Sequence, residues 1–82
     1  MSKFTIELWV NNCFGVLNRI TGLYARRCYN IESINAGPTE IPGVTHIEIV
    51  STGDDYMRTQ VVAQLEKLYD VRKVEITKED RS

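Results

Sequence analysis

Several features that mark specialised classes of protein are missing from this sequence. No apolar run approaches the length that spans a bilayer, and the polar opening Met1-Ser2-Lys3 lacks the apolar centre of a signal peptide. Ten Lys and Arg against eleven Asp and Glu give a formal charge of −1, which provides no field to attract nucleic acid. We therefore expect a cytoplasmic protein with neither a nucleic acid nor a membrane as partner.

Cysteine and histidine are also too scarce to indicate a metal site. Cys13 and Cys28 are separated by fourteen residues without a CxxC pair, and His46 is the single histidine. Nothing in this spacing places a general base beside either thiol. We expect two reduced cysteines, no metal and no catalytic thiol.

The composition that remains is that of one small folded domain. Apolar residues make up 43% of the chain and charged residues 26%, which are ordinary values for a globular protein. At 82 residues the chain is near the lower end of what one hydrophobic core stabilises, so it has no room for two domains.

The first part of the chain predicts a strand followed by a helix. Residues 3–10 alternate between polar and apolar side chains, as in a strand with one buried face. Trp9 falls on the other face, which therefore either meets a partner or covers the rim of its own sheet. From Val16 the apolar residues recur at helical spacing, and Arg26 and Arg27 provide positive charge at the helix end.

The middle of the chain predicts a hairpin and a second helix. We expect strands at residues 29–36 and 44–50, joined by a loop at 37–43 whose two prolines and two glycines favour turns. Residues 52–55 provide cap-forming side chains for a helix. Its predicted apolar stripe consists of Met57, Val61, Leu65 and Leu68.

A last strand at residues 71–76 completes the order strand, helix, strand, strand, helix, strand. Two βαβ units with right-handed crossovers then interlock as one four-stranded antiparallel sheet with both helices on one face, the ferredoxin-like α+β fold. We expect the domain to span residues 1–77 and a charged tail at 78–82 to fray. One face of the sheet and two edges stay uncovered, which invites pairing with another subunit.

The turn between the first strand and the first helix is the candidate site. The first N–H groups of a helix have no partner within it and carry partial positive charge, so they attract an anion such as a carboxylate. Gly15 lets another group approach the backbone closely, and Asn12 either caps the helix or binds a ligand. The alternative is that both residues only shape the helix start.

Nearly the whole chain resembles the ACT domain of the regulatory small subunit of acetolactate (acetohydroxyacid) synthase. The similar residues are 12–34, 37–40 and 42–43. The glycine loop is shared by ACT domains generally, whereas the most specific part is Arg26-Arg27-x-Tyr29-Asn30-Ile31-Glu32-Ser33. In this family Cys28 stands at a position that is usually glycine.

The resemblance implies a non-catalytic subunit in branched-chain amino acid biosynthesis. Such a subunit binds and activates the catalytic large subunit and transmits feedback inhibition by valine, or by isoleucine or leucine. Thiamine diphosphate, FAD and Mg are then expected in the catalytic partner only. Many members of the family continue into a second domain, so this chain is either a short form or a part of a longer subunit.

The resemblance also implies a homodimer or higher oligomer with an effector site at its seam. In the family, two ACT domains pair through their second strands, and the amino acid lies between them. The positions that match the effector site here are Asn12, Cys13, Phe14, Gly15, Val16, Asn30 and Ala36.

Two alternatives to a regulatory subunit of the synthase stay open. The first is a free-standing amino-acid sensor or dimerisation module that serves another metabolic enzyme. The second is a small enzyme of the same fold, for which Asp54 and Asp55 are candidate acids, although helix capping accounts for both.

Overall fold

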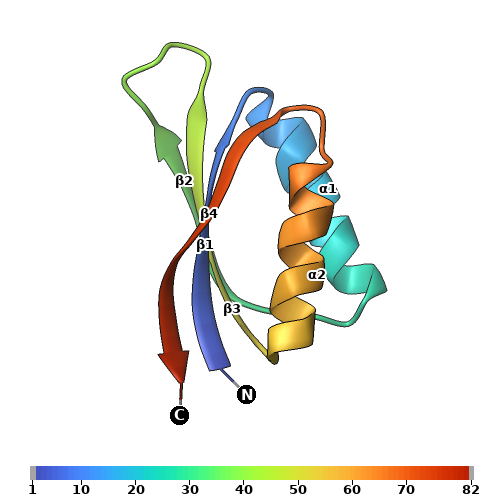
Figure 1. The fold of residues 1–82 in the computed structure, drawn as a ribbon. Coiled ribbons are helices and arrows are strands. Elements are labelled where there is room, and N and C mark those ends of the chain that lie inside the picture. The colour runs from blue at the N-terminus through green and yellow to red at the C-terminus, as the bar shows by residue number, and fades with distance from the viewer. Residues whose placement is uncertain (1, 82) are drawn as a thin grey trace.

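A computed structural model describes residues 2–81 as a four-stranded sheet covered by two helices (Figure 1). The elements follow in the predicted order: β1 (Ser2–Val10), α1 (Cys13–Arg26), β2 (Asn30–Pro38), β3 (Thr45–Gly53), α2 (Asp55–Glu66) and β4 (Val71–Arg81). The strands are antiparallel in the spatial order β2-β3-β1-β4, so β1 and β3 are central and β2 and β4 are edges. The predicted ferredoxin-like fold is confirmed.

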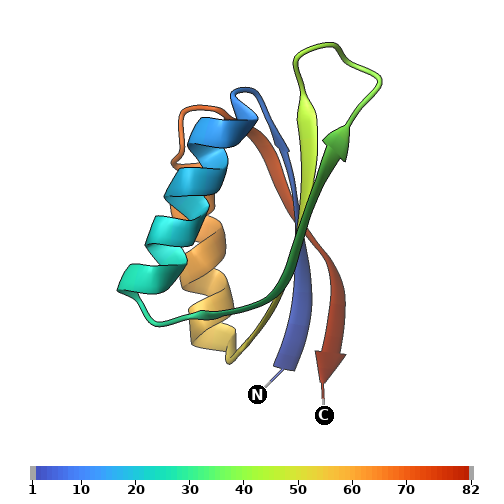
Figure 2. The ribbon, with the colours of Figure 1, turned by 180° about the vertical axis from the view of Figure 1, so that it is seen from behind.

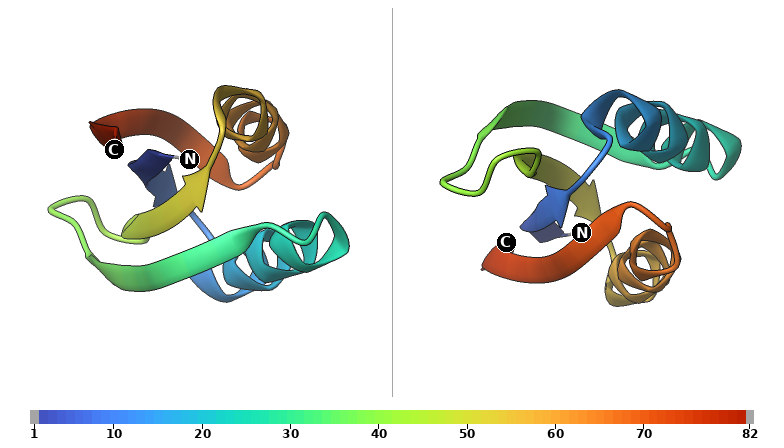
Figure 3. Two further views of the ribbon diagram at one scale, coloured as in Figure 1. Left: turned by 90° about the horizontal axis from the view of Figure 1, so that it is seen from below. Right: turned by 90° about the horizontal axis from the view of Figure 1, so that it is seen from above.

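Both helices lie on the same face of the sheet, as Figures 1 and 2 show from opposite sides. Seen along the strands, α1 lies on the side of β2 and α2 on the side of β4 (Figure 3). The hairpin that joins β2 and β3 projects beyond the helices, and the two chain ends lie together at the opposite end of the sheet (Figure 1). Within residues 2–81, no element covers the other face of the sheet.

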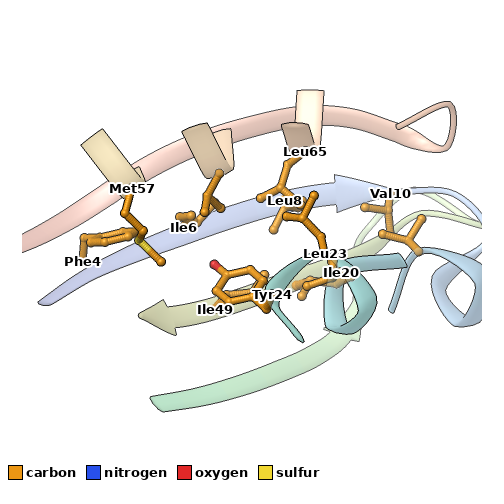
Figure 4. Packing of buried hydrophobic residues seen from close by; sticks show 13 residues of the cluster. Phe4, Ile6, Leu8, Val10, Ile20, Leu23, Tyr24, Ile49, Met57 and Leu65 are labelled. Atoms are coloured by element: carbon orange, nitrogen blue, oxygen red, sulfur yellow. The ribbon is translucent and has the colours of Figure 1, made fainter. Parts of the chain in front are cut away.

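The alternation of β1 supplies the centre of the hydrophobic core. Its even-numbered apolar residues are at most 2% exposed, and they pack between α1 and α2 (Figure 4). Each helix contributes residues three or four positions apart, as expected for amphipathic helices. The core residues are Phe4, Ile6, Leu8, Val10, Val16, Ile20, Leu23, Tyr24, Ile47, Ile49, Met57, Val61 and Leu65.

Side chains cap both helices where the sequence places polar residues. The Asp54 carboxylate accepts a hydrogen bond from the backbone N–H of Met57 at 2.8 Å, which confirms the predicted start of α2. The helix ends at Glu66, however, two residues before Leu68, which lies partly buried in the following turn. The prediction that Leu68 belongs to the helical stripe is therefore wrong, although its contact with the core is real.

The prediction that the charged residues 78–82 fray is wrong for residues 78–81. β4 continues to Arg81 and pairs with the first residues of β1. Arg58 of α2 also forms an ion pair with Glu79. Charge alone did not end the strand, because an edge strand tolerates charged side chains while its backbone pairs with a neighbour. Ser82 lies outside the described residues.

The turn after α1 contains a strained backbone position. Cys28 has a φ of 57°, and its N–H donates to the carbonyl oxygen of Ala25 at 3.2 Å. A left-handed residue just after a helix is most often glycine, because a Cβ disfavours this conformation. Cys28 is solvent-exposed and keeps this conformation without the usual glycine.

A buried hydrogen bond joins α1 to β3. The hydroxyl groups of Tyr24 and Ser51 lie 2.8 Å apart, and the two residues are 2% and 0% exposed. Burial raises the pKa of Tyr24 above its ordinary value, and the hydrogen bond with Ser51 acts in the opposite direction.

We predict that Tyr24→Phe lowers the free energy of unfolding by about 1–3 kcal/mol, because the Ser51 hydroxyl is left buried without a partner. The double variant Tyr24→Phe/Ser51→Ala should regain part of this loss, since it removes both polar groups. Urea unfolding of the single and double variants measures the difference. Additive losses would contradict this account of the pair.

Candidate functional site

Two hydrogen bonds hold the turn between β1 and α1, one to the backbone of another loop and one to a side chain of the turn itself. The N–H of Asn11 donates to the carbonyl oxygen of Asp70 at 2.8 Å, which fastens the turn to the loop before β4. Asn12 is the N-cap of α1: its side-chain oxygen accepts from the N–H of Gly15 at 3.4 Å. Of the two roles that the sequence leaves open for Asn12, the structure shows the cap.

Two N–H groups at the start of α1 stay available. Within residues 2–81, the N–H groups of Cys13 and Phe14 donate to no protein acceptor, and the first turn of the helix contains no acidic side chain. The partial positive charge of the helix start is therefore not neutralised locally. This arrangement suits a small anion, and a carboxylate has the two oxygens to accept from both groups.

Gly15 leaves space for the carboxamide of Asn12. A Cβ at position 15 would lie 2.7 Å from Nδ2 of Asn12, which is too close for carbon and nitrogen atoms without a shift. Gly15 therefore lets the cap fold back over the first turn. The nearby atom is the end of a flexible side chain, so a small substituent at position 15 is accommodated when Asn12 rotates.

The remaining side chains of this segment point in different directions. Val16 is 1% exposed and belongs to the core, whereas Phe14 is 83% exposed. Cys13 is half-buried and packs against the core. Phe14 is the one apolar group of the turn that is free to cover a ligand, because the side chains of Cys13 and Val16 already contact the protein interior.

Of the two predicted site residues on β2, Asn30 lies far from the turn within one chain. Asn30 is the first residue of β2 and lies at the end of the molecule where α1 finishes, and its Nδ2 donates to Oε2 of Glu32 at 2.6 Å. Ala36 is near the other end of the same strand, the end where α1 begins (Figure 2). A single chain thus gathers residues 12–16 and leaves Asn30 a strand length away.

A polar and aromatic cluster on the uncovered face was not identified from the sequence as a site. The Trp9 ring lies between His46, with 5.1 Å between ring centroids, and Lys73, whose Nζ is 5.3 Å from the Trp9 centroid. Nε2 of His46 is 2.7 Å from Oε1 of Glu7. Hydrogen bonds from Thr77 and then from His46 hold the pKa of Glu7 below its ordinary value.

The alternation of residues along β1 and β3 already indicates that Trp9 and His46 lie on the uncovered face. His46 has the parity opposite to Ile47 and Ile49, as Trp9 has the parity opposite to the core residues of β1. Parity assigns a residue to a face, but the register that sets Trp9 opposite His46 on β3 and Lys73 on β4 comes only from strand pairing.

No set of side chains in the described part of the chain has the make-up of a metal site. Groups of three or more His, Cys, Asp or Glu that could hold an ion are absent from residues 2–81. Cys13 and Cys28 are both free thiols. Neither helix among these residues has the length and apolar character needed to cross a membrane.

Comparisons of the sequence with known proteins identify the family. A family model described as "AHAS small subunit-like ACT domain" matches residues 6–73. The chain is 47% identical over 76 residues to the probable acetolactate synthase small subunit of Archaeoglobus fulgidus, covering 92% of this chain and 48% of that protein. It is 49% identical over 73 residues to the acetolactate synthase small subunit of Bacillus subtilis, covering 88% and 42%.

A solved structure shows the same similarity. The crystal structure of the acetolactate synthase small subunit from Thermotoga maritima superposes with a TM-score of 0.79 at 36% identity, over 90% of this chain and 46% of that one. The chain thus spans less than half the length of each of these three relatives.

Proposed function

This chain belongs to the family of AHAS small subunit-like ACT domains, and we propose that it senses an amino acid on behalf of acetolactate synthase. In this proposal it is the non-catalytic regulatory part that binds the catalytic subunit, raises its activity and confers feedback inhibition by valine or a related amino acid. The similarity to proteins named as small subunits of this synthase is the observation that carries the proposal.

The turn before α1 is the proposed site for the effector carboxylate. The free N–H groups of Cys13 and Phe14 supply two donors at the positive end of the helix. Phe14 is exposed beside them and would cover part of the aliphatic side chain. The effector ammonium then needs carbonyl or carboxamide oxygens, which this turn alone does not offer in sufficient number.

A second copy of the chain would supply the missing oxygens. β2 is an edge of the sheet, so its outer backbone groups are open to pairing. If two copies pair through antiparallel β2 strands about a two-fold axis, the first residue of one β2 lies opposite the last residue of the other. Asn30 of the second copy would then lie near the turn of the first, at the end that also carries Ala36.

This dimer provides a route for regulation. An effector that contacts both copies stabilises one arrangement of the seam, and a catalytic subunit that contacts the same pair responds to that arrangement. In this proposal thiamine diphosphate, FAD and Mg belong to the catalytic subunit, and the chain contributes only binding and coupling. A free-standing sensor would use the same seam without the synthase.

Reconstitution tests the proposed function directly. Adding this chain to the cognate catalytic subunit should raise the rate of acetolactate formation, and valine should then reduce the raised rate. Coupling of the usual size changes effector affinity by about 5- to 150-fold when the catalytic subunit is bound. The catalytic subunit without this chain is the control. A rate that is unchanged by the chain would favour the free-standing sensor.

Gly15→Asp should weaken valine binding by at least about ten-fold, because it places a carboxylate where the effector carboxylate is proposed to lie. The new Cβ displaces the Asn12 cap, but an acidic residue in the first turn of a helix is favourable by about 0.3–1 kcal/mol, so we expect a small net change in stability. Isothermal titration calorimetry measures the affinity, and thermal unfolding checks the fold.

Gly15→Ala is the matched control, because it adds a Cβ against Asn12 without adding charge. We expect it to lower affinity less than Gly15→Asp. Equal valine affinity for Gly15→Asp and the unsubstituted chain would remove the turn from the proposed site.

The free chain should sediment as a dimer or larger at tens of micromolar. Asn35→Pro and Ala36→Pro sharpen this test, because adjacent residues of a strand direct their N–H groups to opposite sides. One of the two substitutions therefore removes an N–H directed away from β3 and should shift the chain to monomer. Analytical ultracentrifugation of an unsubstituted chain that is wholly monomeric, with or without valine, would contradict the seam.

A further inference from the structure

The uncovered face of the sheet carries a tryptophan that is not part of the hydrophobic core. Trp9 is the single tryptophan of the chain, and it lies on the side opposite the helices, half-buried against His46 and Lys73. Part of the ring stays exposed although His46 and Lys73 lie against it, and tryptophan is among the residues that contribute most to protein–protein interfaces.

A hollow lies beside this ring at the base of the β2–β3 hairpin. Its volume is about 440 Å³, and its walls come from the strands and from the hairpin loop. Ile41, at 53% exposed, presents an apolar side chain from the loop. We call this the Trp9 hollow; it is lined by Trp9, Pro38, Thr39, Glu40, Ile41 and His46.

The surroundings of the hollow are acidic. The register places Glu7 directly opposite Glu48 on β3 and Glu75 on β4, so three carboxylates follow one another across the sheet. His46 bonds to Glu7, and Nζ of Lys73 is 2.8 Å from Glu75. Within residues 2–81, Glu48 and the hollow-lining Glu40 form no ion pair.

This charge pattern decides between two kinds of occupant. A second copy stacked face to face about a two-fold axis at the hollow would bring the carboxylate row close to the same row of its partner, which is unfavourable. A surface with arginine or lysine beside an apolar side chain would instead pair with Glu48 and Glu40 and fill the hollow. The acidic surroundings therefore favour a basic partner over self-association here.

We propose that the Trp9 hollow is where this chain docks on the catalytic subunit, through one apolar side chain flanked by basic residues. This inference rests on the proposed function. The hollow is on the face away from α1 and shares only Pro38 with β2, so it leaves the turn at residues 12–16 and the rest of the β2 edge free for the effector seam. β2 leads directly into the loop that forms the hollow wall, so a change at the seam reaches the docking surface through one strand.

The test is the affinity of the chain for its cognate catalytic subunit, measured by biolayer interferometry. Trp9→Ala and Ile41→Ser should each weaken binding by at least about ten-fold, as expected at the centre of an interface. Glu48→Lys should weaken it several-fold, and affinity of the unsubstituted chain should fall as salt rises. Ile41 is on an exposed loop, so its substitution does not endanger the fold.

Matched control substitutions are available on α2, away from the Trp9 hollow. Tyr56→Ala removes an aromatic side chain that is 72% exposed, and Glu66→Lys makes the same charge reversal on α2. Both should bind the catalytic subunit like the unsubstituted chain. Trp9→Ala should also keep its thermal shift with valine, because the hollow is separate from the effector turn.

The outcomes separate this inference from the proposed function. If Ile41→Ser and Glu48→Lys bind the catalytic subunit as tightly as the unsubstituted chain, the Trp9 hollow is not the docking surface and the proposed function stands. If the unsubstituted chain does not bind the catalytic subunit, the proposed function fails and the docking inference fails with it.

Discussion

The structure depends on a sheet that is covered on one side only. Two helices are enough to bury one face of four strands, and the even-numbered residues of β1 lie at the centre of that buried layer. Within residues 2–81 no further element covers the other face, where strand alternation places the odd-numbered residues of β1. An 82-residue domain is small enough that this unequal coverage leaves a large part of its surface open to partners.

The same arrangement creates surfaces with different chemistry. The start of α1 offers backbone donors and positive dipole charge, which suits a small anion. The β2 edge offers a row of backbone groups, which suits another strand. The uncovered face offers tryptophan, a hollow with apolar and polar walls, and carboxylates, which suits a basic protein surface. In the proposed function, the effector site and the partner surface must not compete, and the one-sided sheet sets the two proposed sites apart.

The conformations at the two ends of α1 depend on local side chains at one end and on backbone contacts at the other. At its start, the Asn12 side chain caps the N–H of Gly15, and the N–H groups of Cys13 and Phe14 donate to no acceptor among residues 2–81. At its end, Cys28 accepts a left-handed backbone that glycine would adopt more easily. The turn that follows leads into β2, and the N–H of Tyr29 donates to the carbonyl oxygen of Tyr24 at 2.9 Å across it.

The sequence by itself determined the elements, their order and the face that each residue occupies, because periods of 2 and 3.6 residues follow from local backbone geometry. It also identified the turn at residues 12–16, since an N-cap and its helix are neighbours in the chain. Tertiary structure decided the rest. Strand pairing ordered residues 78–81 and set Trp9 between His46 and Lys73, and the length of β2 put Asn30 far from the turn. These outcomes depend on register between distant segments, which no local pattern specifies.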